Sequence, residues 1–133
     1  MTSNPQADVS TPVVDPYRYY EIKGQVYPLT SITQSIAVGN NTVILTGVSG
    51  VRVLVMGYIF MSTSAAVPGV VSLKDGSGGT TYIIANSPIY GNAAEKIPPG
   101  PVMLMTTTAG TGLYCDVAAN QSYVTVWYIS YTV

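Results

Sequence analysis

The chain has 133 residues, of which 47% are hydrophobic and only 8% charged, with a formal net charge of −1. Soluble domains carry about 25% charged residues, so we expect other protein to cover much of this surface. The five lysines and arginines are scattered, which argues against a nucleic-acid partner. The longest apolar run, Val53 to Met61, is far shorter than the ~20 residues of a membrane-spanning helix, so no membrane partner is expected.

The length fits one domain with its own hydrophobic core. The polar start, Met1 to Asp8, contains no Lys or Arg and does not resemble a secretion signal, so synthesis and use in a cytoplasm are expected. Cys115 is the single cysteine, which cannot form an internal disulfide and is expected to be a small buried hydrophobe.

The first 28 residues differ from the rest because four prolines interrupt them and no hydrophobic period is sustained. Proline disfavours both helix and central strand, so residues 1–28 are predicted to be an extended N-terminal arm and residues 29–133 a β-sandwich domain. The arm contains the cluster Tyr17, Arg18, Tyr19 and Tyr20. This cluster is either a strand that packs its tyrosines on the same domain or a docking segment, because Tyr and Arg commonly anchor interfaces.

From Ile32 onward, β-branched and aromatic runs alternate with Gly, Asn, Asp and Pro, which predicts an all-β protein without a helix. Eight strands in about 100 residues are typical of an antiparallel β-sandwich or jelly roll. The predicted strands are Ile32–Val38, Asn41–Thr46, Val51–Ser62, Gly69–Lys74, Thr80–Ala85, Val102–Thr107, Gly112–Val117 and Tyr123–Thr132.

The connections carry turn signals. Gly39-Asn40 and Ser49-Gly50 separate the early strands, and the run Asp75 to Gly79 predicts a hairpin. This glycine-rich run lacks the Lys-Ser/Thr ending of a phosphate-binding loop. The long connection Asn86 to Pro101 is predicted to cross one end of the sandwich, either as a functional loop or as a plain crossover between sheets.

The last strand is apolar on both faces. Val124, Val126 and Tyr128 share one face, whereas Tyr123, Thr125, Trp127, Ile129 and Tyr131 share the other. The segment Val51 to Met61 has the same character. A solvent-exposed strand normally has a polar face, so these strands are either central in the sandwich or in contact with another chain.

The sequence offers no catalytic constellation. It contains no His, and its six acidic residues lie in the arm, in turns or next to lysines. Zinc and iron sites need several His or Cys ligands, and a calcium loop needs several carboxylates. We therefore expect no enzymatic activity, no cofactor and no metal site.

Several segments resemble small virion proteins of tailed bacteriophages, namely β-sandwich (jelly-roll) capsid decoration or cement proteins and related fibre modules. The resemblance covers residues 35–133 and consists of strand and turn texture. It is carried by the segments Ala37 to Thr46, Ser49 to Leu54, Val71 to Gly76 and Met105 to Leu113, followed by the closing Val- and Tyr-rich strand.

The resemblance implies a non-enzymatic structural protein on the outer surface of a phage head, in contact with the major capsid protein and often homotrimeric. Under this hypothesis, Tyr17, Arg18, Tyr19 and Tyr20 dock on the capsid. The subunit interface is formed by the last strand or the Val51 to Met61 strand, with Val55, Tyr123, Thr125 and Trp127 as its candidate residues.

Two alternatives remain open. In the first, the chain is a receptor-binding or carbohydrate-binding module of a phage fibre or tail, with tyrosines stacking on sugar and the Asn86 to Pro101 loop shaping the site. In the second, it is a small structural subunit of a non-viral shell or fibre.

Overall fold

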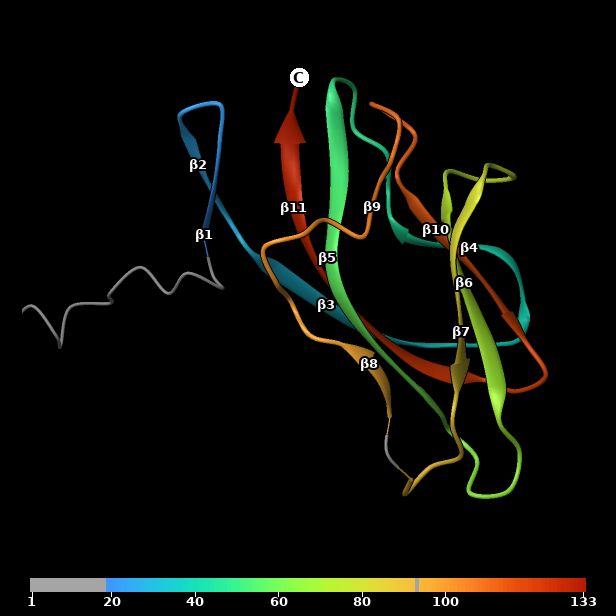
Figure 1. Cartoon of the computed structure of the whole chain (residues 1–133). Helices are drawn as coiled ribbons and strands as arrows, with labels where there is room; N and C mark the ends of the chain where they lie inside the picture. Colours follow the sequence, from blue (N-terminus) through green and yellow to red (C-terminus); the bar gives the residue numbers. More distant parts are fainter. Residues whose placement is uncertain (1–18, 93) are drawn as a thin grey trace, which may run out of the picture.

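The computed structural model describes residues 19–92 and 94–133, and these residues form an all-β protein with three antiparallel sheets (Figure 1). The strands are β1 (Tyr19–Ile22), β2 (Gln25–Pro28), β3 (Thr30–Ile36), β4 (Gly39–Leu45), β5 (Val51–Ser62), β6 (Gly69–Asp75), β7 (Thr81–Ser87), β8 (Glu95–Ile97), β9 (Met105–Thr106), β10 (Leu113–Ala118) and β11 (Ser122–Thr132). Within the described residues there is no helix that could span a membrane.

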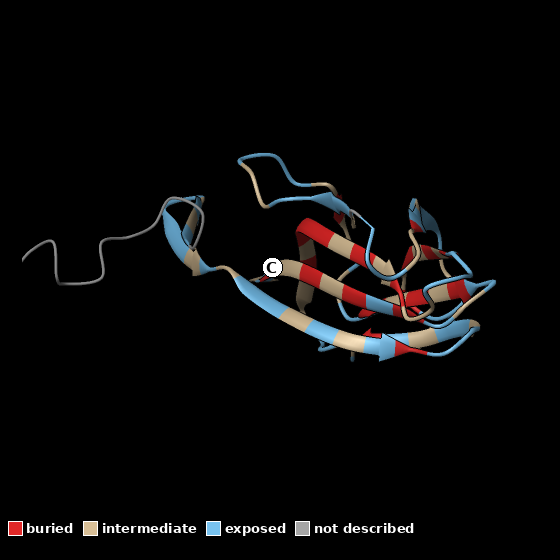
Figure 2. Ribbon diagram, turned by 90° about the horizontal axis from the view of Figure 1, so that it is seen from below, coloured by how far each residue is buried: buried red, intermediate tan, exposed pale blue. Residues whose placement is uncertain are grey.

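Two larger sheets enclose the core in a β-sandwich-like arrangement. The five-stranded sheet has the order β3-β11-β5-β8, with β9 also paired to β5, and the four-stranded sheet has the order β4-β10-β6-β7. Buried residues alternate with more exposed ones along the long strands (Figure 2). The core side chains come from both sheets, for example Val55, Phe60 and Val126 from one and Leu73 and Leu113 from the other.

Residues 19–28 form a β-hairpin where the sequence predicted an extended arm. Lys23 and Gly24 both have positive φ angles, 51° and 78°, as a two-residue turn of the primed type requires. The hairpin packs against the domain through Tyr20 and Tyr27. The rest of the predicted arm, residues 1–18, lies outside the described residues.

All eight predicted strands overlap an observed strand, but the described residues contain eleven strands, and Gly39 and Asn40 begin β4 where they were expected to separate two strands. The predicted strand Val102–Thr107 is reduced to the two residues of β9, and the short strand β8 lies in the predicted long connection. That connection does pass from one sheet to the other, because β7 and β8 belong to different sheets. The hairpin at Asp75 to Gly79 is confirmed by the pairing of β6 with β7.

The strand β5 contains a bulge at Met56. Trp127 pairs with Gly57 and Tyr128 with Val55, so Met56 has no partner residue on β11. Before the bulge, Val53 and Val55 belong to the core cluster, and after it Tyr58 and Phe60 do. Because of this extra residue, odd-numbered side chains face the core before the bulge and even-numbered ones face it afterwards, so the same face of the strand stays buried.

Candidate interaction surface

The outer face of the five-stranded sheet carries aromatic and aliphatic side chains in consecutive rows. Tyr123 pairs with Met61, and Thr125 pairs with Ile59. Trp127 follows two residues later on the same face of β11, because side chains alternate along a strand. Hydroxyl contacts also occur here, since the Oγ1 atoms of Thr33 and Thr125 lie 2.9 Å apart. The face is thus largely uncharged in its central rows.

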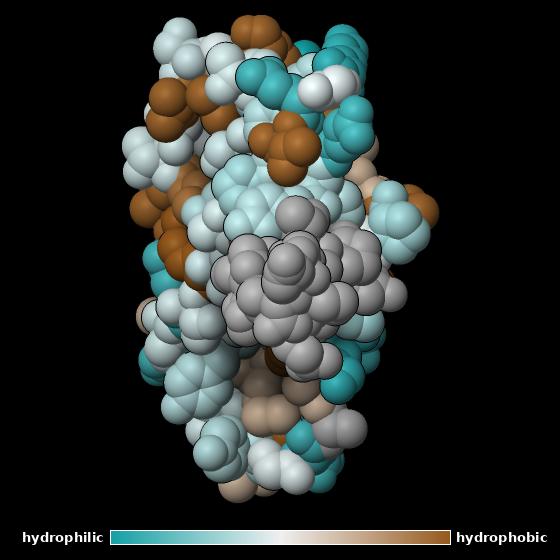
Figure 3. Space-filling view, turned by 90° about the vertical axis from the view of Figure 1, so that its left-hand side faces the viewer, coloured by the Kyte–Doolittle hydropathy of each residue, from teal (hydrophilic) through white to brown (hydrophobic). Residues whose placement is uncertain are grey.

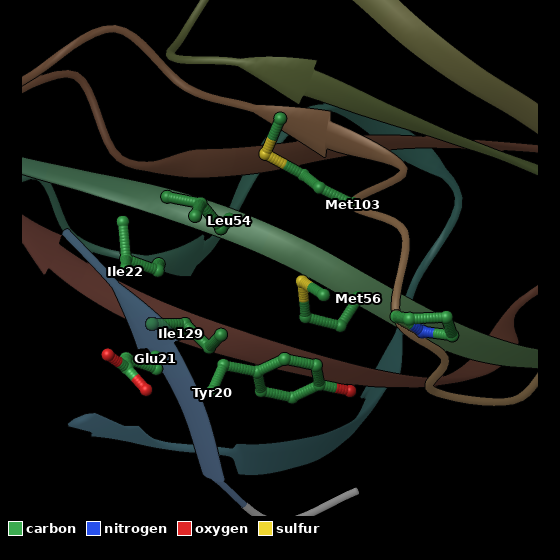
Figure 4. A pocket seen from close by; sticks show the side chains of 8 residues that line it. Tyr20, Glu21, Ile22, Leu54, Met56, Met103 and Ile129 are labelled. Carbon is green, nitrogen blue, oxygen red and sulfur yellow. The ribbon is translucent and has the colours of Figure 1, made fainter. Parts of the chain in front are cut away.

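One half of this face is covered by the chain itself. The hairpin and the loop at residues 98–104 enclose a cavity of about 290 Å³ (Figure 4). Its lining is apolar apart from Glu21 and comprises Tyr20, Glu21, Ile22, Leu54, Met56, Pro101, Met103 and Ile129. The cover is effective, because Ile129 and Met56 are only 1% and 4% exposed although they lie outside the main core cluster.

Specific contacts hold this cover in place. The Tyr20 hydroxyl donates a hydrogen bond to the Gly100 carbonyl at 2.8 Å, and the rings of Tyr27 and Tyr131 lie 5.3 Å apart. Gly57 lets the loop lie directly on β5, because a Cβ atom there would come within 2.7 Å of the backbone of Ile97. The covered half is therefore built into the fold.

The other half of the face, around Tyr123, is open. Tyr123 is 42% exposed, and its ring lies 6.3 Å from the exposed ring of Tyr90. Next to this open half, Lys96 of the edge strand β8 pairs with Ile59 of β5. The side of the molecule that carries the β1–β2 hairpin faces the viewer in Figure 3, where hydrophobic residues form separate brown groups among more hydrophilic ones.

The structure distinguishes among the residues predicted for docking. Tyr17 and Arg18 lie outside the described residues. Tyr19 is exposed, whereas Tyr20 packs on its own domain, which was one of the two interpretations of this cluster.

Among the predicted interface residues, Val55 is wrongly assigned. It is 0% exposed and lies in the core between the sheets, so it presents no side chain to another subunit. The sequence could not separate the two faces of β5, because both are apolar. Tyr123, Thr125 and Trp127 do lie on the outer face, and their role as an interface stays a prediction.

The outer face of the four-stranded sheet is organised differently, around a buried charge. Lys74 is 7% exposed, and its ammonium group donates to Asn41 Oδ1 at 2.6 Å and contacts Asp116 at 3.3 Å. Asp116 Oδ1 also accepts the Asn41 amide, and Asn41 Oδ1 accepts the Gly78 amide. These contacts join β4, β6, β10 and the turn after β6, so the role of the cluster is to hold these elements together.

Two titratable groups are perturbed for structural reasons. Burial raises the pKa of the Cys115 thiol to about 12, helped by the nearby Asp116 carboxylate. Burial alone would raise the pKa of Asp75, but hydrogen bonds from Thr108 and Thr111 hold it below its ordinary value. Within residues 19–92 and 94–133, no three His, Cys, Asp or Glu residues gather as metal ligands would.

Comparisons with known proteins do not assign a function to this surface. No protein-family model matches the sequence, and no curated protein matches it. A function must therefore be inferred from the residues and the surfaces they form.

Proposed function

We propose that this chain is a non-enzymatic capsid decoration, or cement, protein of a tailed phage. The observation that carries the proposal is the outer face of the five-stranded sheet, which is half covered by the chain itself, largely uncharged in its central rows and exposed at Tyr123. Exposed apolar surface rimmed by polar residues marks sites of protein contact. In this proposal, Tyr123, Thr125 and Trp127 contact a second copy in a homotrimer, and residues 17–19 contact the major capsid protein.

The strand order supports a jelly-roll assignment. When β8 and β9 are counted together as the sixth of eight strands that begin with β3, the two sheets have the orders 1-8-3-6 and 2-7-4-5. This is the connectivity of two interleaved Greek keys, which defines a jelly roll. Many virion proteins use this fold, but a fold alone does not imply a function.

The proposed activity needs only binding. A protein that binds the assembled shell and not its separated subunits stabilises the shell by linkage. Many copies, each held weakly, add to the effect through multivalency. The protein is made in the host cytoplasm in this proposal and acts on the outer surface of the capsid.

The first test is the copy number of this chain in purified particles of the phage that encodes it. Quantitative mass spectrometry relative to the major capsid protein is expected to give a comparable number of copies. A few dozen copies or fewer would favour a fibre or tail module, and absence from the particle would refute the virion assignment.

The second test separates the two proposed contacts. A variant lacking residues 2–18 keeps the hairpin that packs on the domain, and it is expected to lose capsid binding while its circular dichroism is unchanged. Tyr123→Ala is expected to weaken self-association in analytical ultracentrifugation. Tyr82→Ala, which removes an exposed tyrosine from the opposite sheet, is the matched control and should alter neither property.

A further inference from the structure

A second cavity, of about 490 Å³ and broadly open to solvent, lies where β7 ends and β6 begins. It is lined by Pro68, Asn86, Pro88, Ile89 and Asn92. None of these residues is charged, and three of them offer only apolar side chains. The cavity is separate from the apolar cavity beneath the hairpin, because the two share no lining residue.

The walls of this cavity are fixed by hydrogen bonds between the two loops that form it. The Ser62 amide donates to the Pro88 carbonyl at 2.8 Å, and the Tyr90 amide donates to the Ser64 carbonyl at 2.7 Å. The Ser62 hydroxyl donates to the Val67 carbonyl at 2.6 Å. The loop that contributes Pro68 and the loop that contributes Pro88 are thereby held in one arrangement.

A buried serine cluster supports these walls from inside. The hydroxyls of Ser87 and Ser122 lie 2.7 Å apart, and both residues are 0% exposed. Asn120 donates its side-chain amide to the Ser62 hydroxyl at 2.7 Å. Gly69 packs so closely that a Cβ atom there would lie 2.6 Å from the Ser87 hydroxyl. A cavity with such support is preorganised, which reduces the entropic cost of binding.

The two asparagines that line the cavity differ from the asparagines used elsewhere. Asn41 and Asn120 use their side-chain amides within the protein. Asn86 and Asn92 are exposed to solvent, and their carboxamides make no hydrogen bond to any residue in the described part of the chain. Each carboxamide can donate two hydrogen bonds and accept two, so the cavity offers both kinds of group to a ligand.

We propose that this cavity binds a neutral saccharide. A carboxamide can donate to one hydroxyl of a sugar and accept from the next, and two carboxamides can orient one ring. Pro68, Pro88 and Ile89 offer apolar surface for the C–H groups of the ring. A lining without charge disfavours sialylated or sulfated glycans.

This site goes beyond capsid binding, and its test uses the isolated full-length protein without capsid. Methyl glycosides of glucose, galactose, mannose and N-acetylglucosamine, with the methyl glycoside of N-acetylneuraminic acid for comparison, are titrated into ¹⁵N-labelled protein. The side-chain NH₂ signals of Asn86 and Asn92 report binding in ¹H–¹⁵N spectra. At least one neutral glycoside is expected to shift these signals with a dissociation constant on the order of 1 mM.

Matched variants complete the test. Asn86→Ala and Asn92→Ala are each expected to weaken binding about tenfold, since each removes hydrogen bonds to the ligand. Asn40→Ala changes an exposed asparagine on β4 outside the cavity and should bind as the parent does. Circular dichroism identifies any variant that fails to fold, and in that case Asn→Asp at the same position replaces it.

Three results would overturn the proposal. The first is that no neutral glycoside shifts the two NH₂ signals at concentrations far above millimolar. The second is equal affinity in folded Asn86 and Asn92 variants and in the parent. The third is tighter binding of the sialic acid glycoside than of every neutral one. None of these results bears on capsid binding, which is measured separately.

Discussion

The outer faces of the two large sheets are built in different ways. On the four-stranded sheet, the buried Lys74 is joined to the half-buried Asp116 and the exposed Asn41, so its charge is satisfied within the chain. On the five-stranded sheet, the hairpin and a loop cover Met56 and Ile129, whereas Tyr123 stays open. The polar cluster ties the first face together at its centre, although Val43, Tyr82 and Ile84 lie exposed beside it. The second face is partly enclosed by the chain and ends at an uncovered aromatic row, and this is the face on which we propose the interface.

The largest expected effect is a difference in stability between a substitution on the inner face of the five-stranded sheet and one on its outer face. Val55→Glu places a carboxylate in the core, so it is expected to destabilise the protein by more than about 4 kcal/mol and to prevent folding. Thr125→Glu, on the outer face, is expected to cost about 1 kcal/mol through the lost contact with Thr33. Circular dichroism and urea denaturation measure both. Equal destabilisation by the two variants would contradict the assignment of faces.

The next effect concerns the polar cluster on the four-stranded sheet. Lys74→Met keeps the aliphatic stem but removes the ammonium group, which leaves Asp116 without its counter-charge. A loss of about 2 kcal/mol in the free energy of unfolding is expected. Lys96→Met, at an exposed site on the other sheet, is the control and should stay within about 0.5 kcal/mol of the parent. A Lys74 variant as stable as this control would show that the cluster contributes little.

A smaller and more local effect is expected in the hairpin. Tyr27→Ala removes the ring contact with Tyr131, which is worth about 1 kcal/mol. Hydrogen exchange should accelerate in β1 and β2 and stay unchanged in β10, where the buried Cys115 thiol should also remain unreactive. Faster exchange throughout the core would mean that the hairpin is required for the fold itself.

The smallest effect depends on pH. Because the pKa of folded Asp75 lies below its ordinary value, its carboxylate stabilises the fold above that ordinary value, and this contribution disappears as the pH falls through the folded pKa. The difference in urea midpoint between the parent and Asp75→Asn should therefore be largest near neutral pH and shrink below about pH 4. A difference that does not vary with pH would exclude this role of the carboxylate.

Prediction from sequence worked where the chain contains sustained runs of β-branched and aromatic residues. The strands β5, β6 and β11 were located closely because each is rich in β-branched or aromatic residues, and β5 and β11 are also long. The strand β8 was missed because its three residues, Glu95–Ile97, are all exposed and no buried face marks them. The β1–β2 hairpin was missed because its turn uses Lys23 at a positive φ angle, which Lys seldom adopts.

The candidate sites were harder to predict for a topological reason. Val55 was assigned to an interface because an all-apolar strand gives no sign of which side faces inward. Under the carbohydrate-binding alternative, the Asn86 to Pro101 connection was expected to shape a sugar site. The contribution of Pro68, from a different loop, depends on the hydrogen bonds that join the two loops and leaves no signal in the sequence.

The bulge at Met56 also has a consequence for how this protein can vary in length. Elsewhere in β5, adding or removing one residue would exchange core and surface side chains along half of the strand. Removing Met56 would not, because a strand one residue shorter could pair Val55 and Gly57 with adjacent residues of β11 and keep every side chain of the core cluster in place. Related proteins can therefore be expected to lack one residue at this point of the strand.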